Sequence, residues 1–239
     1  MLSVDTSFIG PPGWAHLVAF GVLVPWMAIH SRRRVVAGTK LPTLTAHFVS
    51  TLLVLVAFGT LSWTVAKVEW IQLFPAQWPA LRDWLVGAVV LATMIGCMVP
   101  VWRSAWCNPA GRDLRVRAMF APRTATERLL WLCVSLFAGV SEEITWRGVQ
   151  WTLSTRLVGS ALLAAALCVA SFTVAHAVQG RRSMSRIAAI AAAFHFLVWL
   201  SESLVVAMAV HFLYDVAAGL AHGYFRKRHE ATVGEATVR

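Results

Sequence analysis

The chain has 239 residues, of which 58% are hydrophobic and only 13% are charged, whereas soluble domains have roughly 45–50% apolar and about 25% charged residues. The apolar residues come in blocks long enough to cross a bilayer, which takes about 20 residues, so the composition excludes an ordinary soluble domain. The formal net charge of +10 does not indicate nucleic acid binding, because the basic residues cluster between the apolar blocks, where they suit anionic lipid headgroups.

The apolar blocks predict about seven transmembrane helices, so the expected fold class is an all-α, polytopic integral membrane helical bundle. In chain order the predicted helices cover residues 14–29, 44–66, 84–101, 128–149, 161–177, 187–200 and 204–224. We divide the chain into three parts: N-terminal helices with a basic cytoplasmic connector (1–123), a helical core that carries three polar motifs (124–225) and a basic cytoplasmic tail (226–239).

Lys and Arg are distributed unevenly over the connections between the predicted helices. Of the 21 basic residues, 17 lie after the first, third, fifth and seventh helices, within residues 32–40, 103–128, 181–186 and 226–239. The positive-inside rule assigns such connections to the cytoplasm. We therefore expect a multi-pass protein of the plasma or inner membrane, with its N-terminus outside and its C-terminus in the cytoplasm.

Three carboxylates lie well inside the apolar blocks, namely Glu142, Glu143 and Asp215. A charged side chain near the bilayer centre costs roughly 2.5–3.5 kcal/mol, so such a group usually faces a cavity or a partner. Glu143 precedes Arg147 by four residues, a spacing at which the two can pair on one helical face. Glu142 points about 100° away around the helix and is free to act as a base. The alternative is a structural ion pair in which both glutamates bond Arg147.

Two further polar motifs follow on later helices. Phe172 and His176 stand four residues apart near the end of the fifth helix, and His211 and Asp215 have the same spacing on the last. Asp215 could orient the imidazole of His211 or join it at a metal ion. A single histidine near a helix end is also typical of packing or interfacial anchoring, so the spacing of His176 is weak evidence by itself.

The predicted turns allow these residues to meet at one depth in the membrane. Glu142 and His176 each lie 17 residues from a turn near Gly159. Counting residues from the next two predicted turns, near Met184 and Glu202, places His211 within about one or two helical turns of that depth. A continuous helix over residues 128–156 would be about 43 Å long, which exceeds the ~30 Å of the hydrocarbon core, so it must tilt, break or protrude.

The other histidines are assigned simpler roles. His195 lies within the sixth apolar block, where core packing is favoured over a place in the cavity. Interfacial positions suffice for the remaining five, which are His16, His30, His47, His222 and His229.

The three motifs, E-E-x-x-x-R, F-x-x-x-H and H-x-x-x-D, resemble those of the CAAX protease and bacteriocin-processing family of intramembrane endopeptidases. The resemblance covers roughly residues 128–220, and it implies an all-helical membrane fold with a polar cavity. It implies that Glu142 and His176 activate water for peptide hydrolysis, and that His211 and Asp215 either stabilise the oxyanion or take part in metal binding. The same resemblance gives supporting roles to Glu143, Arg147 and Phe172.

Two features depart from the family pattern. Asp215 stands where many members carry asparagine, and an ionised aspartate donates no hydrogen bond to an oxyanion. It must therefore be protonated, orient His211 or bind a metal. A zinc site of His176, His211 and Asp215 with Glu142 as base and a metal-free glutamate mechanism are comparable alternatives. The second departure, Thr145-Trp146 before Arg147, is interpreted as a change in the cavity lining.

The sequence thus favours an intramembrane endopeptidase that hydrolyses a peptide bond of a membrane-associated protein or peptide. The alternative is a non-proteolytic membrane scaffold or immunity protein that keeps the fold. A proton-coupled transporter fits less well, because repeated halves and broken helices are not evident. The expected partners are the lipid bilayer and the peptide substrate, and nothing in the sequence identifies a pocket for a prenyl group.

Overall fold

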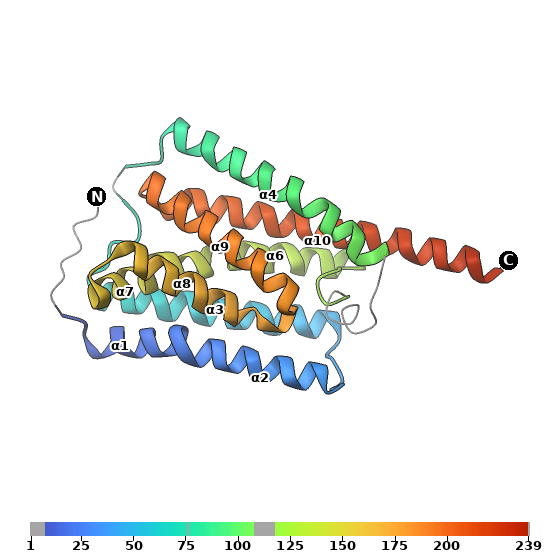
Figure 1. Cartoon of the computed structure of the whole chain (residues 1–239), viewed down its shortest axis with the longest axis horizontal. Coiled ribbons are helices and arrows are strands. Elements are labelled where there is room, and N and C mark those ends of the chain that lie inside the picture. The colour runs from blue at the N-terminus through green and yellow to red at the C-terminus, as the bar shows by residue number, and fades with distance from the viewer. Residues whose placement is uncertain (1–7, 76, 108–117, 239) are drawn as a thin grey trace.

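The computed structural model describes residues 8–75, 77–107 and 118–238, and all regular secondary structure in these ranges is helical. The helices run roughly along one common direction, and the C-terminal part of the last one projects beyond the others (Figure 1). In chain order they are α1 (Pro11–Val18), η1 (Ala19–Leu23), α2 (Val24–Val36), α3 (Leu44–Val68), α4 (Leu81–Cys107), α6 (Ala125–Glu142), η2 (Glu143–Gln150), α7 (Trp151–Val158), α8 (Ala161–Ala175), η3 (Ala177–Gln179), α9 (Arg181–Ser201) and α10 (Leu204–Val238). Segments η1 and η2 are π-helical, and η3 is a 3₁₀ turn.

The all-α polytopic fold is confirmed, with six helices that are long and apolar enough to cross a bilayer among the described residues. The seventh predicted helix corresponds to α8, an apolar helix of 15 residues that is about 22 Å long and shorter than the other six. Ser160 caps its first turn, and α8 ends at Ala175 with His176 as its C-cap. The chain then turns back through η3 and Gly180, whose φ of 95° is readily adopted by glycine.

The basic connections lie together at one end of the bundle. The end of α2, the end of α4 and the start of α9 are found at the same end, from which α10 projects, while the start of α4 and the α7–α8 turn lie at the other (Figure 1). Residues 108–117 of the predicted basic connector fall outside the described residues. The uneven charge distribution therefore corresponds to two physical ends of the fold, and the cytoplasmic side of the basic end remains a prediction.

The helix that carries the first motif is continuous over Ala125–Val158, and its conformation changes in the middle. It starts at residue 125 because Thr124 and Glu127 form a capping box. At Glu143 the α-helix gives way to eight π-helical residues, and α-helix resumes at Trp151. The long helix therefore does not break, and its π segment has the wider i→i+5 hydrogen bonding that is often found at functional sites.

A chain of buried polar contacts holds the outer side of η2 against α1 and α3. The two ring nitrogens of His16 lie 3.0 Å from Gln150 Oε1 and 3.0 Å from Ser62 Oγ. Ser62 Oγ lies 2.9 Å from Thr145 Oγ1, which donates to the Ser141 carbonyl. The interfacial interpretation of His16 is therefore wrong, because the side chain is buried and pairs with polar groups from two other helices.

Helices α6 and α10 approach each other closely at Gly139. A Cβ atom at this position would lie 2.8 Å from the Met208 carbonyl oxygen and 3.0 Å from the Phe212 backbone nitrogen. Only glycine allows the two backbones to come this near. The contact is one turn before Glu143 and beside His211, so it brings the first and third motifs together.

The last helix continues past residue 224, where the sequence predicts its end. Arg226 donates to the Ala121 carbonyl at 2.8 Å and pairs with Glu230 at 3.3 Å along the helix. The predicted basic tail therefore extends α10 rather than following it.

We expect a reporter fused after Arg239 to be active in the cytoplasm, because all basic connections share one end of the bundle. A second fusion within residues 69–80, between α3 and α4, should be active only outside. The opposite result for the two fusions would reverse the orientation.

We expect Gly139→Ala to lower the thermal unfolding midpoint of the purified protein, since the new methyl group would meet backbone atoms of α10. Overpacking of this kind costs about 1–3 kcal/mol. Gly96→Ala is the matched control, because a methyl group on Gly96 of α4 would meet no neighbouring side chain or helix within 4 Å, and alanine is the better helix former. Equal midpoints for the two variants would contradict the close packing of α6 and α10.

Candidate active site

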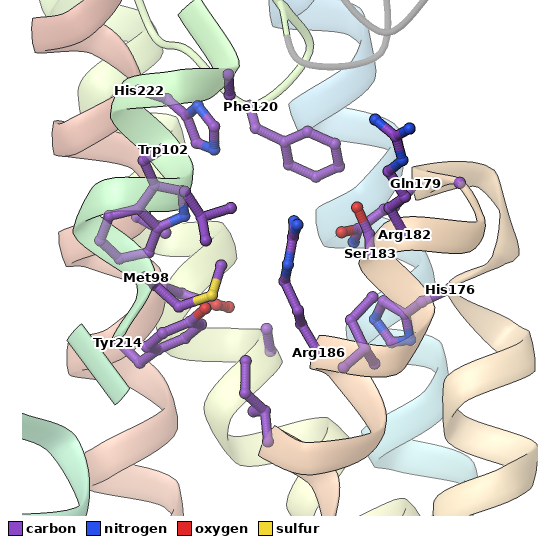
Figure 2. A pocket seen from close by; sticks show the side chains of 18 of the residues that line it. Met98, Trp102, Phe120, His176, Gln179, Arg182, Ser183, Arg186, Tyr214 and His222 are labelled. Atoms are coloured by element: carbon purple, nitrogen blue, oxygen red, sulfur yellow. The ribbon is translucent and has the colours of Figure 1, made fainter. Parts of the chain in front are cut away.

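The three motifs meet at one cavity of about 660 Å³ between α4, α6, α9 and α10. Figure 2 shows Met98, Trp102 and Tyr214 on one side and His176 and Gln179 on the other. Glu142, His176, His211 and Asp215 all line this cavity. The structure thus brings together the four side chains to which the sequence assigns the chemistry, although they come from three different helices.

Glu143 and Arg147 form the expected ion pair, with Arg147 Nη1 at 3.2 Å from Glu143 Oε1. Both side chains have no exposed surface, so the pair is fully buried. The guanidinium also lies over the rings of Phe172 and Phe194, at 4.5 and 5.3 Å from their centroids. Because the guanidinium of Arg147 pairs with Glu143 and lies over the two phenylalanine rings, the alternative in which both glutamates bond it is wrong.

The two neighbouring glutamates face different surroundings. Glu142 ends α6 and Glu143 begins η2, and only Glu142 lines the cavity. The Glu142 side chain keeps 14% of its surface exposed, whereas that of Glu143 has none. A water molecule in the cavity can therefore reach the carboxylate of Glu142 but not that of Glu143.

His211 is held from both of its ring nitrogens. Its Nδ1 lies 2.8 Å from Glu143 Oε1, and since a carboxylate only accepts, Nδ1 carries the proton and donates. Its Nε2 lies 3.6 Å from Asp215 Oδ2 and 3.8 Å from Glu142 Oε2. Glu143 is therefore the residue that orients the imidazole, and Asp215 lies beside the nitrogen that faces Glu142.

His176 presents the opposite ring nitrogen to the cavity. Its Nδ1 lies 2.8 Å from the Phe172 carbonyl oxygen, which can only accept, so Nδ1 donates. The neutral ring then has its lone pair on Nε2, where it can accept a proton or a hydrogen bond from water. The spacing of four explains this contact, because residue 172 is one helical turn before the last residue of α8.

Phe194 is a site residue that the sequence did not reveal. Its ring stacks on that of His211, with centroids 4.8 Å apart, and it also contacts Arg147. Phe194, His211, Glu143 and Arg147 thus form a closed ring of contacts. A phenylalanine in an apolar helix carries no distinguishing sequence signal, because most such residues only pack.

Asp215 is also fixed through its backbone. Trp131 on α6 donates its indole N–H to the Asp215 carbonyl at 3.0 Å, and Gly219 packs directly against the same indole ring. The position of Asp215 therefore depends on the packing of α6 against α10, as does the contact between Glu143 and His211.

The zinc alternative requires three converging ligands. No group of three or more His, Cys, Asp or Glu side chains in the described ranges is arranged to hold a metal ion, so His176, His211 and Asp215 do not form an assembled site. The contact between His211 Nδ1 and Glu143 leaves Nε2 facing Glu142 and Asp215, which is also the orientation of many metal-binding histidines. As placed in the described ranges, these side chains do not form a three-ligand metal site.

The surroundings of His195, His222 and Trp146 test what the sequence predicts for these three residues. His195 is buried, donates from Nδ1 to the Ala191 carbonyl and packs on Trp151, so core packing is confirmed. His222 lines the cavity and accepts from the Trp106 indole, so it has contacts beyond the interfacial position predicted for it. Trp146 packs against Phe20 rather than lining the cavity, because this face of η2 points towards η1 and α3.

Residues 124–217 match the sequence profile of a family described as Type II CAAX prenyl endopeptidase Rce1-like. The matched range contains every residue of the three motifs. The resemblance to the CAAX protease and bacteriocin-processing family is therefore confirmed over this range, which is similar to CAAX-type prenyl endopeptidases. Neither a curated protein nor a solved structure matches the chain.

We expect Glu143→Gln to destabilise the protein strongly, because it leaves the guanidinium of Arg147 buried without a counter-charge. Removing one partner of a buried ion pair costs about 3–5 kcal/mol. Thermal unfolding in one detergent measures the effect, and Glu142→Gln serves as the matched control at the adjacent position. If Glu142→Gln were the less stable variant, the assignment of the two glutamates would be reversed.

Proposed function

We propose that this protein is an intramembrane endopeptidase that hydrolyses a peptide bond of a membrane-associated protein or peptide. The observation that carries the proposal is the convergence of Glu142, His176, His211 and Asp215 on one cavity. The similarity of residues 124–217 to CAAX-type prenyl endopeptidases supports the same reaction class.

Glu142 and His176 activate the hydrolytic water in this proposal. The Glu142 carboxylate takes a proton from the water, while Nε2 of His176 accepts a hydrogen bond and holds the water in place. The resulting hydroxide attacks the carbonyl carbon of the scissile peptide bond. When the C–N bond breaks, the proton on Glu142 passes to the leaving nitrogen, which departs as an amine.

His211 stabilises the tetrahedral intermediate in this proposal. With Nδ1–H donated to Glu143, the protonated imidazole donates its other N–H towards the developing oxyanion. The nearby carboxylate of Asp215 acts as the counter-ion of that imidazolium. This role accounts for an aspartate at this position, since a counter-ion need not donate a hydrogen bond.

The cavity suits a substrate that reaches it from the membrane and from the basic end of the bundle. Its lining combines apolar side chains of α4 with polar residues of η3 and the start of α9, such as Gln179 and Ser183. A prenylated CAAX peptide is the first substrate to test, because the description of the matched family specifies prenyl endopeptidases.

We expect Glu142→Gln and His176→Ala to lower the cleavage rate by about 10²–10⁴, the usual contribution of general acid–base assistance. The purified protein is assayed in lipid nanodiscs with quenched fluorescent prenylated and unprenylated peptides. Comparison of membrane peptidomes from cells with wild-type protein and with Glu142→Gln extends the search to other substrates.

His195→Asn is the control for this assay, because His195 is buried outside the cavity and should be dispensable for cleavage. Full cleavage activity in well-folded Glu142→Ala would refute the mechanism. If wild-type protein and Glu142→Gln gave the same peptides in both experiments, the scaffold alternative would replace the enzyme.

We expect cleavage to persist after treatment with a chelator, since the proposed steps use only side chains of this chain. The measurement compares the rate before and after removal of divalent metals, with the metal content of the preparation determined in parallel. Loss of activity that zinc restores, together with zinc content lost in Asp215→Ala, would establish the metal alternative instead.

A further inference from the structure

The charges that line the cavity are divided between its two ends. The two carboxylates in the lining, Glu142 and Asp215, both lie beside His211. Four arginines also line the cavity, and they are Arg32 on α2 and Arg181, Arg182 and Arg186 on α9. No carboxylate in the described part of the chain forms an ion pair with any of these four guanidinium groups. This end of the cavity therefore carries positive charge that the described residues do not neutralise.

One face of α9 connects the arginines to the catalytic residues. Arg182, Arg186, Ile190 and Phe194 follow each other at spacings of four, and all line the cavity. Phe194 marks the level of the site because it stacks on His211. Arg186 is eight residues away, about 12 Å along the helix. Its side chain extends through the cavity between His176 and Tyr214 (Figure 2).

Arg186 and Arg32 differ from the other basic residues at this end of the bundle. Both are half-buried and line the cavity, whereas the neighbouring Arg33 and Arg34 are exposed and lie outside its lining. Exposed arginines suit lipid headgroups at the membrane surface. A half-buried guanidinium inside the reaction cavity is instead available to a group that enters with the substrate.

We propose that Arg186, assisted by Arg32 and Arg182, binds a carboxylate of the substrate peptide, either its C-terminus or an Asp or Glu side chain. This inference rests on the proposed peptidase function and adds a determinant of specificity to it. The guanidinium group is planar and binds carboxylates through two parallel hydrogen bonds. An extended peptide covers about 3.3 Å per residue, so about four residues span the distance from Arg186 to the level of Phe194.

The test measures peptide binding to full-length Glu142→Gln protein in phosphatidylcholine nanodiscs, so that no cleavage intervenes. The probes are short labelled apolar peptides in four versions, with a free or amidated C-terminus and with Asp or Asn near that end. We expect the versions that carry a carboxylate to bind at least about tenfold more tightly than the neutral one. The two single-carboxylate versions distinguish a terminal from a side-chain carboxylate.

Adding Arg186→Gln should remove this preference, and Arg186→Lys should retain part of it, because lysine keeps the charge without the bidentate geometry. Arg33→Gln is the matched control and should keep the full preference. Arg182→Gln provides a second variant at an exposed position of the same helix face. A reduced preference in Arg182→Gln supports the proposal even if Arg186→Gln fails to fold.

Three outcomes would overturn the inference. They are Glu142→Gln protein without preference for carboxylates, an unchanged preference when folded Arg186→Gln and Arg182→Gln are added to it, and loss of the preference when phosphatidylglycerol is added to the nanodiscs. The last outcome would assign the arginines to lipid phosphate. Because binding is measured without cleavage, a carboxylate preference in a protein that cuts no peptide would refute the proposed function and leave this inference standing.

Discussion

The buried ion pair between Glu143 and Arg147 constrains the rest of the site. Neither side chain reaches solvent, and an unpaired charge at such a position is costly in a membrane protein. The pair must therefore form, and its geometry determines what else can lie nearby. Glu143 accepts from His211, and Arg147 lies against the rings of Phe172 and Phe194. The motifs on three helices are connected through these contacts.

The long helix around this pair is held from two sides. On one side, Gly139 allows the backbones of α6 and α10 to meet, so that His211 reaches Glu143. On the other side, the polar chain through His16, Ser62 and Thr145 fixes the outer face of η2. The π-helical segment therefore has polar partners on the face that points away from the cavity, which is required in an environment without water.

The cavity combines two electrostatic environments in a small volume. Carboxylates surround His211 at one end, and arginines without carboxylate partners among the described residues line the other. The arginine end coincides with the end of the bundle where the basic connections gather (Figure 1). The charge pattern from which the membrane orientation is predicted and the charges proposed to bind the substrate thus arise from the same segments, at the start of α9 and the end of α2.

The sequence alone determined the membrane class, the approximate helices and the three motifs, because hydropathy and spacing within one helix are local properties. The Glu143–Arg147 pair was predictable for the same reason, since both residues belong to one helical face. Spacing could not show that Glu143 would orient His211, that Phe194 would stack on it, or that His16 would be buried. These contacts join residues of different helices, and they depend on how closely the helices pack.

The tertiary structure also determined two features that local sequence patterns predicted wrongly, namely the end of α8 and the direction of two side chains of η2. The fifth apolar stretch predicts a helix over residues 161–177, but the helix α8 ends at Ala175 and the chain turns back at Gly180. The residues Thr145 and Trp146 appeared suited to the cavity lining, yet the direction of η2 turns them towards α3 and η1. Composition records how much a segment prefers lipid, whereas the direction of each side chain is set by the partners that packing brings within reach.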